Sequence, residues 1–149
     1  MKRVFYLLVL LCLIALLSAC GGGSSQNADA VQQGEVAGEK VKVAGGAYTD
    51  VDVAELQSML ANKDFTFVNV HIPFEGDIAN TDVSIRYDQI EQNLSLLPPE
   101  KDAKIVLYCR SDRMSNIAAE TLVSLGYSNV YNLKGGMVAW ERAGLPLVK

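Results

Sequence analysis

Residues 104–115 read KIVLYCRSDRMS, and this stretch decides the fold. Its first five residues are the most apolar short run of the second half, which predicts a central strand buried on both faces. Polar residues follow at once, and then residues 114–125 repeat apolar side chains at helical spacing until Gly126 ends the pattern. A buried strand that leads directly into an amphipathic helix is typical of a parallel α/β sheet.

The flanking segments continue the alternation of helices and strands. Asp52 and Glu55 form a capping-box pattern ahead of apolar residues at helical spacing, which predicts a short helix at 53–61. Turn-forming residues, Pro73 among them, predict a loop at 71–84. By the same patterns, strands are expected at 65–70 and 129–133, and helices at 87–96 and 136–142. We therefore predict a single α/β domain over residues 48–149, with a mostly parallel central sheet flanked by helices.

The N-terminal twenty residues have the pattern of an export signal. Lys2 and Arg3 precede an unbroken apolar and aromatic run at 4–17. The run is shorter than the roughly 20 residues that span a bilayer and fits the core of a signal peptide. The next residues, LSAC at 17–20, resemble the lipobox of bacterial lipoproteins. That resemblance implies cleavage before Cys20 and lipidation of its sulfur.

Three segments of the chain follow from this interpretation. Residues 1–19 are predicted to be a lipoprotein signal peptide, and 20–47 the lipidated Cys20 with a flexible linker, since residues 21–47 are rich in Gly, Ser, Gln and Ala. Val41 and Val43 leave a minor edge strand open there, although the prediction treats them as linker. The protein is then exported and anchored to a membrane by its N-terminal lipid, on the periplasmic or another extracytoplasmic face. Because Gly21 rather than Asp follows Cys20, the lipoprotein resemblance implies an outer membrane where the cell has one.

Composition excludes several classes of function. The chain has 149 residues, with 13 Lys and Arg against 17 Asp and Glu, and a formal net charge of −4. An acidic balance without a basic cluster argues against nucleic acid as a partner. The chain has three Cys, two of them in the N-terminal segment, and one His. This set offers neither a disulfide framework nor metal-ligand spacing, so the sequence predicts no metal and no cofactor.

Cys109 is the candidate nucleophile, because it stands directly between the central strand and the following helix. Ligands bind at the carboxyl ends of parallel strands, where loop N–H groups and the first turn of a helix form a cradle for an anion. A thiol in such a cradle ionises readily; Arg110 and Arg113 strengthen this effect and Asp112 opposes it. Five of the next six residues are polar or charged, which argues against an inert core thiol.

The body resembles the rhodanese-like (sulfurtransferase) family over nearly all of residues 48–149. Three segments carry the resemblance: YCRSDRMS at 108–115, VYNLKGGMVAW at 130–140, and the weaker NVH and EGDI motifs within 69–78. The loop of that family commonly reads Cys-Arg-Ser-Gly with an Arg near its end. In this chain Asp112 takes the Gly position, where a glycine-type backbone angle is expected, and Arg113 comes one place early. Asn69 and His71 replace an acid–base pair that normally fixes the neighbouring loop.

The resemblance implies a sulfurtransferase in which Cys109 attacks the sulfane sulfur of a small anionic donor, thiosulfate or a polysulfide. The resulting persulfide passes its outer sulfur to an acceptor, either a small-molecule or protein thiol or another nucleophile. A thiolate needs no general base, so His71 is interpreted as a hydrogen-bonding residue of the surface or loop. The resemblance assigns donor and persulfide binding to the loop residues that follow the nucleophile, namely Arg110, Ser111, Asp112, Arg113, Met114 and Ser115.

Two other functions stay open from the sequence. A cysteine phosphatase can share this fold, but its loop needs an Arg six residues after the Cys, and Ser115 stands there. A non-catalytic sulfur carrier, or a redox-sensing or partner-binding module at the cell envelope, would use the same oxidation-prone thiol.

Overall fold

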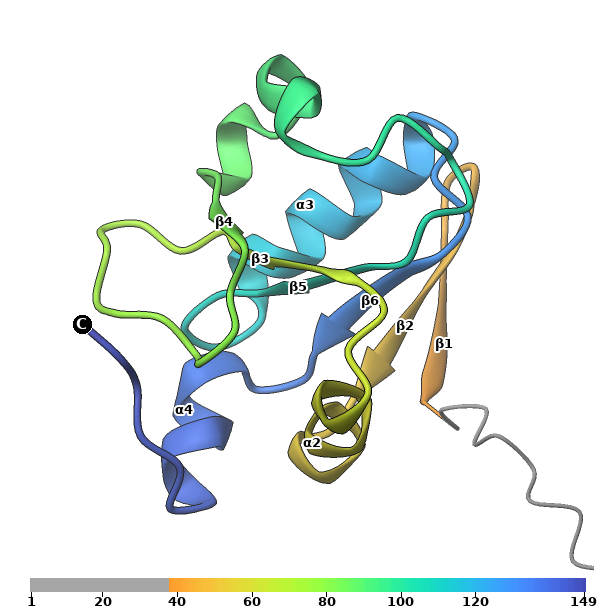
Figure 1. Ribbon diagram of the computed structural model, residues 1–149. Coiled ribbons are helices and arrows are strands. Elements are labelled where there is room, and N and C mark those ends of the chain that lie inside the picture. Colours follow the sequence, from red (N-terminus) through yellow and green to blue (C-terminus); the bar gives the residue numbers. More distant parts are fainter. Residues whose placement is uncertain (1–37) are drawn as a thin grey trace, which may run out of the picture. The chain divides into compact units, whose positions relative to one another are not determined.

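The computed structural model describes residues 38–149, which form one sheet with helices on both faces (Figure 1). The elements in chain order are β1 Glu39–Val43, β2 Gly46–Val51, α2 Val53–Ala61, β3 Thr66–Asn69, β4 Val83–Ser84, η1 Tyr87–Gln89, η2 Glu91–Leu96, β5 Ile105–Tyr108, α3 Arg113–Ser124, β6 Val130–Leu133 and α4 Gly136–Arg142. The six strands lie in the order β1-β2-β6-β5-β3-β4. Only β1 is antiparallel to its neighbour. The predicted α/β class with a mostly parallel sheet is confirmed.

The sheet separates two hydrophobic clusters. Helix α3 and the two 3-10 helices cover one face, and α2 and α4 cover the other (Figure 1). Strand β5 shows the alternation: Ile105 and Leu107 pack with the α3 cluster, whereas Val106 and Tyr108 pack with the α2–α4 cluster. All four residues are fully buried, as predicted for a doubly covered strand. Each such side chain contributes about 1.5–3 kcal/mol of hydrophobic free energy.

Helix α2 begins where the capping-box pattern placed it. The Asp52 carboxylate accepts a hydrogen bond from the Glu55 N–H at 2.8 Å, and the Glu55 carboxylate accepts one from the Asp52 N–H at 2.8 Å. The helix then spans Val53–Ala61, as predicted. Trp140 of α4 is 6% exposed and belongs to the core beneath that helix.

The predicted flexible linker is wrong for residues 38–47. Strands β1 and β2 form an antiparallel hairpin there, with Val41 opposite Tyr48. Val41 and Val43 pack against the α3 cluster, so the hairpin gains apolar burial that its Gly-rich and Ala-rich composition does not indicate. The rest of the predicted linker, the predicted signal peptide and Cys20 lie outside the described residues. Within residues 38–149, no helix has the length and apolar character needed to cross a membrane.

Two further segments differ from the sequence prediction. Residues 87–96 form two 3-10 helices rather than one α-helix, and the second of them, η2, is kinked where Asn93 leaves helical geometry (φ −118°, ψ 26°). The predicted loop at 71–84 ends in the short strand β4, in which Val83 pairs with Val68 of β3.

Candidate active site

The Cys109 sulfur lies at the carboxyl end of the central strand β5, and two hydrogen bonds point at it. The main-chain N–H of Asp112 donates to Sγ at 3.2 Å, and the hydroxyl of Ser115 donates to Sγ at 3.3 Å. Cys109 is 2% exposed and Ser115 is fully buried. The Asp112 N–H is thus a fixed donor to the sulfur, whereas the single proton of the Ser115 hydroxyl is shared between Sγ and the Asp112 carbonyl oxygen, 3.0 Å away. Donors of this kind favour a negative charge on a sulfur from which water is largely excluded.

Asp112 holds the loop in an unusual conformation. Its φ is +127° and its ψ is −52°, so the expectation of a glycine-type backbone angle is confirmed. Such geometry costs a non-glycine residue about 1–3 kcal/mol. The Asp112 carbonyl accepts hydrogen bonds from the Ser115 hydroxyl at 3.0 Å and the Asn116 N–H at 2.8 Å. Its carboxylate accepts one from the Gly135 N–H at 2.6 Å, which ties the loop to the turn before α4.

A second connection joins the loop to α4. The N–H groups of Met137 and Val138 donate to the carbonyls of Cys109 and Arg110, at 2.9 and 3.0 Å. Gly136 permits this approach, since its φ is +53° and a Cβ atom there would lie 2.8 Å from the Arg110 carbonyl oxygen. The Gly135-Gly136 turn thus fixes the backbone of the loop from behind.

Arg110 is at the rim of the site, and its charge is shared with Glu75. Its Nη1 donates to Glu75 Oε2 at 2.6 Å, with the two side chains 45% and 38% exposed. The other Glu75 oxygen, Oε1, lies 3.4 Å from His71 Nε2. Glu75 belongs to a segment of the family resemblance, but no sequence pattern places it at the site. The one feature that could have indicated its pairing with His71 is their i,i+4 spacing.

His71 is not the surface residue that the sequence prediction allowed. Its side chain is 7% exposed, and neither ring nitrogen has a hydrogen-bond partner among the described residues. Its main-chain N–H donates to Asn69 Oδ1 at 2.9 Å. The imidazole thus lies beneath the rim, and the carboxylate of Glu75 is 3.4 Å from its Nε2 atom.

An amide replaces the acid–base pair that the family resemblance led us to expect after β3. Asn69 Nδ2 donates to the Gly76 carbonyl at 3.0 Å and to Asp77 Oδ1 at 2.8 Å. The Tyr108 hydroxyl also donates to Asp77 Oδ1, at 3.1 Å, and accepts from the Ile78 N–H at 3.0 Å. Burial raises the pKa of Tyr108, so the hydroxyl stays protonated as a donor. An amide and a phenol, which both donate to the Asp77 carboxylate, therefore anchor the rim loop.

The three other loop residues that were predicted to bind the donor differ in their exposure to solvent. Ser111 and Arg113 are exposed. The Met114 side chain is partly buried and packs against the α3 cluster, so it points away from solvent. The loop brings Asp112 and Ser115 onto the sulfur and leaves Arg110 at the rim.

A polar cluster that the sequence analysis missed lies under the first turns of α3. Asn132 is fully buried, and its Nδ2 donates to Asp50 Oδ1 at 2.8 Å and to Asn116 Oδ1 at 3.0 Å. Burial raises the pKa of Asp50, although the hydrogen bond from Asn132 opposes the shift. Asn132 lies in an otherwise apolar strand, so only the tertiary structure places it beside Asp50 and Asn116.

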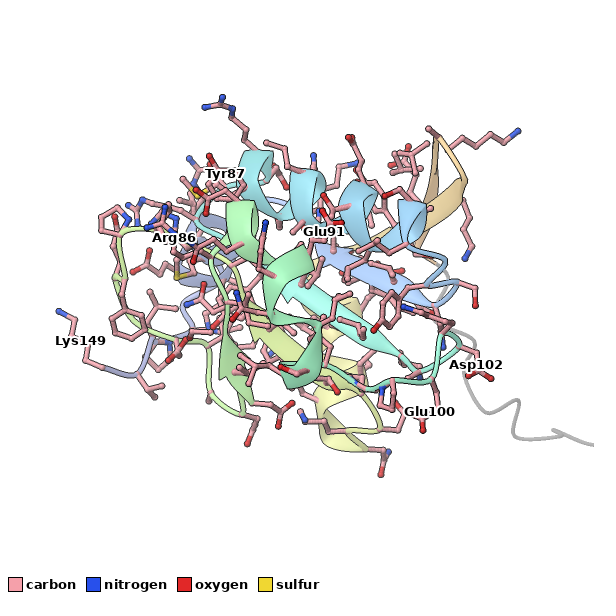
Figure 2. The ribbon with its side chains drawn as sticks, turned by 90° about the horizontal axis from the view of Figure 1, so that it is seen from above. Arg86, Tyr87, Glu91, Glu100, Asp102 and Lys149 are labelled. Carbon is pink, nitrogen blue, oxygen red and sulfur yellow. The ribbon has the colours of Figure 1, made fainter. Side chains whose placement is uncertain are left out.

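Charged groups of the 86–102 segment do not gather at the site. Arg86 is exposed and pairs with Asp88 at 2.9 Å. Figure 2 shows Arg86 at one end of the domain, and Glu100 with Asp102 at the other. These acidic residues are solvated and scattered rather than part of one patch.

Comparisons with known proteins agree with this geometry. Residues 52–143 match the family model described as the rhodanese-like domain. The chain is 35% identical over 103 residues to a sulfurtransferase of Allochromatium vinosum, covering 66% of this chain and 94% of that protein. It is 30% identical to a tRNA uridine(34) hydroxylase of Erwinia tasmaniensis, covering 68% of this chain but 31% of that protein. The crystal structure of a rhodanese-related protein from Thermoplasma volcanium superimposes with a TM-score of 0.58 at 31% identity, covering 68% of this chain and 98% of the other.

Proposed function

This chain belongs to the rhodanese-like domain family, and on that premise we propose that it transfers sulfane sulfur through a persulfide on Cys109. The donor is thiosulfate or a polysulfide, and the acceptor is a thiol or another nucleophile. The family and its sulfurtransferase relatives support sulfur transfer by an enzyme of this type.

In the first half-reaction the Cys109 thiolate attacks the outer sulfur of thiosulfate. A new S–S bond forms to Cys109, the original S–S bond breaks, and sulfite leaves with the bonding electron pair. The nucleophile in this step is the thiolate form of Cys109, so no general base takes part in the attack. The Asp112 N–H and the Ser115 hydroxyl, which donate to Sγ at 3.2 and 3.3 Å, stabilise this thiolate and place it at the strand end.

In the second half-reaction an acceptor thiolate attacks the outer sulfur of the persulfide. The Cys109 sulfur is then the leaving group, and it departs as a thiolate into the same two hydrogen bonds. The donors that activate the nucleophile therefore also assist its release, as preorganised donors do in other anion-stabilising sites. Arg110 lies at the rim, where it is paired with Glu75.

The observation that carries this proposal is a nearly buried sulfur with two convergent donors at the end of the central strand. Its test is the intact mass of the protein after incubation with thiosulfate and removal of the excess. We expect the mass to rise by one sulfur atom, located on Cys109 by peptide mapping, and sulfite to be released during the incubation; a free thiol added afterwards should remove the extra sulfur. The Cys109→Ser variant should show neither; an equal mass shift in that variant would refute the assignment.

The alternatives of a sulfur carrier and a redox sensor would use the same thiol, and the 2% exposure of Cys109 limits the access of an oxidant and of a sulfur donor alike. Repeated sulfite release distinguishes an enzyme from a carrier, since a carrier loads one sulfur and stops. In place of the Arg that a phosphatase loop requires, Ser115 donates to the sulfur, which disfavours phosphate chemistry.

We further propose that the protein is an exported lipoprotein anchored through Cys20. The support is the charged start, the apolar run at 4–17 and the LSAC site. In cells fed a labelled fatty acid, the full-length chain should carry the label in the membrane fraction. A Cys20→Ser variant should remain unlabelled; a labelled variant would disprove the anchor.

A further inference from the structure

At the rim of the site, the positive charge of Arg110 is balanced by the carboxylate of Glu75. Arg110 donates to Glu75 at 2.6 Å, and the second Glu75 oxygen lies 3.4 Å from the buried His71 ring. Glu75 thus lies between the His71 ring and Arg110, with which it forms an ion pair. An approaching anion meets an ion pair at this rim instead of a free positive charge.

A second carboxylate lies within the loop itself. The Asp112 carboxylate accepts from a main-chain N–H, that of Gly135, and not from a side-chain cation. The main-chain N–H of the same residue donates to the Cys109 sulfur at 3.2 Å, so this carboxylate belongs to the loop that holds the sulfur. The loop thus carries one carboxylate of its own, and a second carboxylate, that of Glu75, is bound to the residue next to Cys109.

We propose that Glu75 determines donor specificity, and that the site favours an organic persulfide, R–S–SH, over the dianion thiosulfate. This inference rests on the proposed function and narrows its donor class. A dianion is repelled by Glu75 and Asp112 and gains little from an Arg110 that is already paired. A persulfide group carries at most one charge, so it loses less on approach.

The rim also offers apolar contact for an organic donor. Phe74, the residue before Glu75, is 60% exposed. An exposed phenyl ring on the residue adjacent to Glu75 in sequence is available to the carbon atoms of an organic persulfide, whereas an inorganic oxyanion gains nothing from it. Charge and apolar surface thus favour the same class of donor.

The transfer step is balanced without an added oxidant. The Cys109 thiolate attacks the outer sulfur of R–S–SH, the donor S–S bond breaks, and a new S–S bond forms on Cys109. R–S⁻ leaves with the electron pair and takes a proton from water. The sulfane sulfur keeps its oxidation state, so the donor thiol is simply released.

Steady-state kinetics of the full chain with thiosulfate and with benzyl persulfide, whose organic group is uncharged and apolar, test this specificity. In wild type we expect the higher kcat/KM for the persulfide. Glu75→Gln, which keeps the side-chain size, should raise kcat/KM for thiosulfate about threefold to tenfold through KM, because an exposed ion pair has a modest effect. The persulfide value should change less than twofold. Glu100→Gln is the control: it makes the same charge change at the end of the domain away from Arg86 (Figure 2). It should leave kcat/KM for both donors unchanged.

Two further measurements keep the inference falsifiable if Glu75→Gln perturbs folding. In wild type, kcat/KM for thiosulfate should not fall as salt is raised, because no net attraction is present to be screened; a steep fall would overturn the inference. Phe74→Ala should lower kcat/KM for the persulfide more than for thiosulfate.

The outcomes separate the two levels of the proposal. Equal effects of Glu75→Gln on both donors, or a wild-type preference for thiosulfate, would overturn the specificity while leaving sulfur transfer intact. Absence of Cys109-dependent turnover with both donors would instead overturn the proposed function, and this inference with it.

Discussion

Replacing Gly136 by alanine should disrupt the site from behind without touching any reactive group. Its φ of +53° strains an alanine by about 1–2 kcal/mol. The new Cβ would also overlap the Cys109 carbonyl oxygen and lie 2.8 Å from the Arg110 carbonyl carbon and oxygen. Overpacking against backbone adds about 1–3 kcal/mol, so the variant should lose about 2–5 kcal/mol in all.

Gly144→Ala is the matched control. Gly144 has a φ of +80°, but nothing lies within 4 Å of the added Cβ, so this variant should lose only the backbone strain of about 1–2 kcal/mol. Urea unfolding gives both free energies, and the rate of persulfide formation on Cys109 gives the effect on the loop. Gly136→Ala should load sulfur far more slowly than Gly144→Ala. Equal stability and equal rates in the two variants would refute the argument that Gly136 supports the loop.

Two other substitutions test the rim and the polar cluster. Tyr108→Phe removes the hydroxyl that pairs with the Ile78 N–H and Asp77, and leaving that buried N–H unpaired should cost about 1–3 kcal/mol in urea unfolding; an unchanged unfolding free energy would contradict the network. For Asp50, burial raises the pKa in the folded state, so the folded protein binds the proton more tightly than the unfolded chain and ionisation lowers stability as pH rises. Asp50→Asn should therefore be more stable than wild type at pH 7, by well under about 1 kcal/mol because the group is partly solvated, and the gain should vanish below about pH 4; a gain that is the same at pH 3 and pH 7 would contradict this cause.

Features that depend on neighbouring residues were predictable from the sequence. The capping box fixes the start of α2 through contacts three residues apart. The KIVLY run is buried on both faces because its composition leaves no polar side for solvent. Cys109 was identifiable for the same reason, since the change from apolar to polar residues marks the strand end where ligands bind.

Features that depend on tertiary pairing were not predictable. Strand β1 was missed because its stability comes from its pairing with β2 and its contact with α3, not from its own composition. The Ser115 hydroxyl is oriented by the Asp112 carbonyl, whose direction follows from a φ of +127° that no sequence pattern specifies. Glu75 is brought to Arg110 by a loop that Asn69 and Tyr108 anchor. The two residues are 35 positions apart in the sequence, so no local pattern indicates their ion pair.

The hydrogen bonds from Met137 and Val138 to the carbonyls of Cys109 and Arg110 make the reactive loop an extension of the C-terminal helix. The loop cannot open alone, because its movement would leave two N–H groups of α4 without hydrogen-bond acceptors, and Trp140 of that helix is part of the core. On heating, we therefore expect no folded state in which the loop of Cys109 alone is disordered. Loss of activity and detachment of α4 should occur in a single cooperative transition.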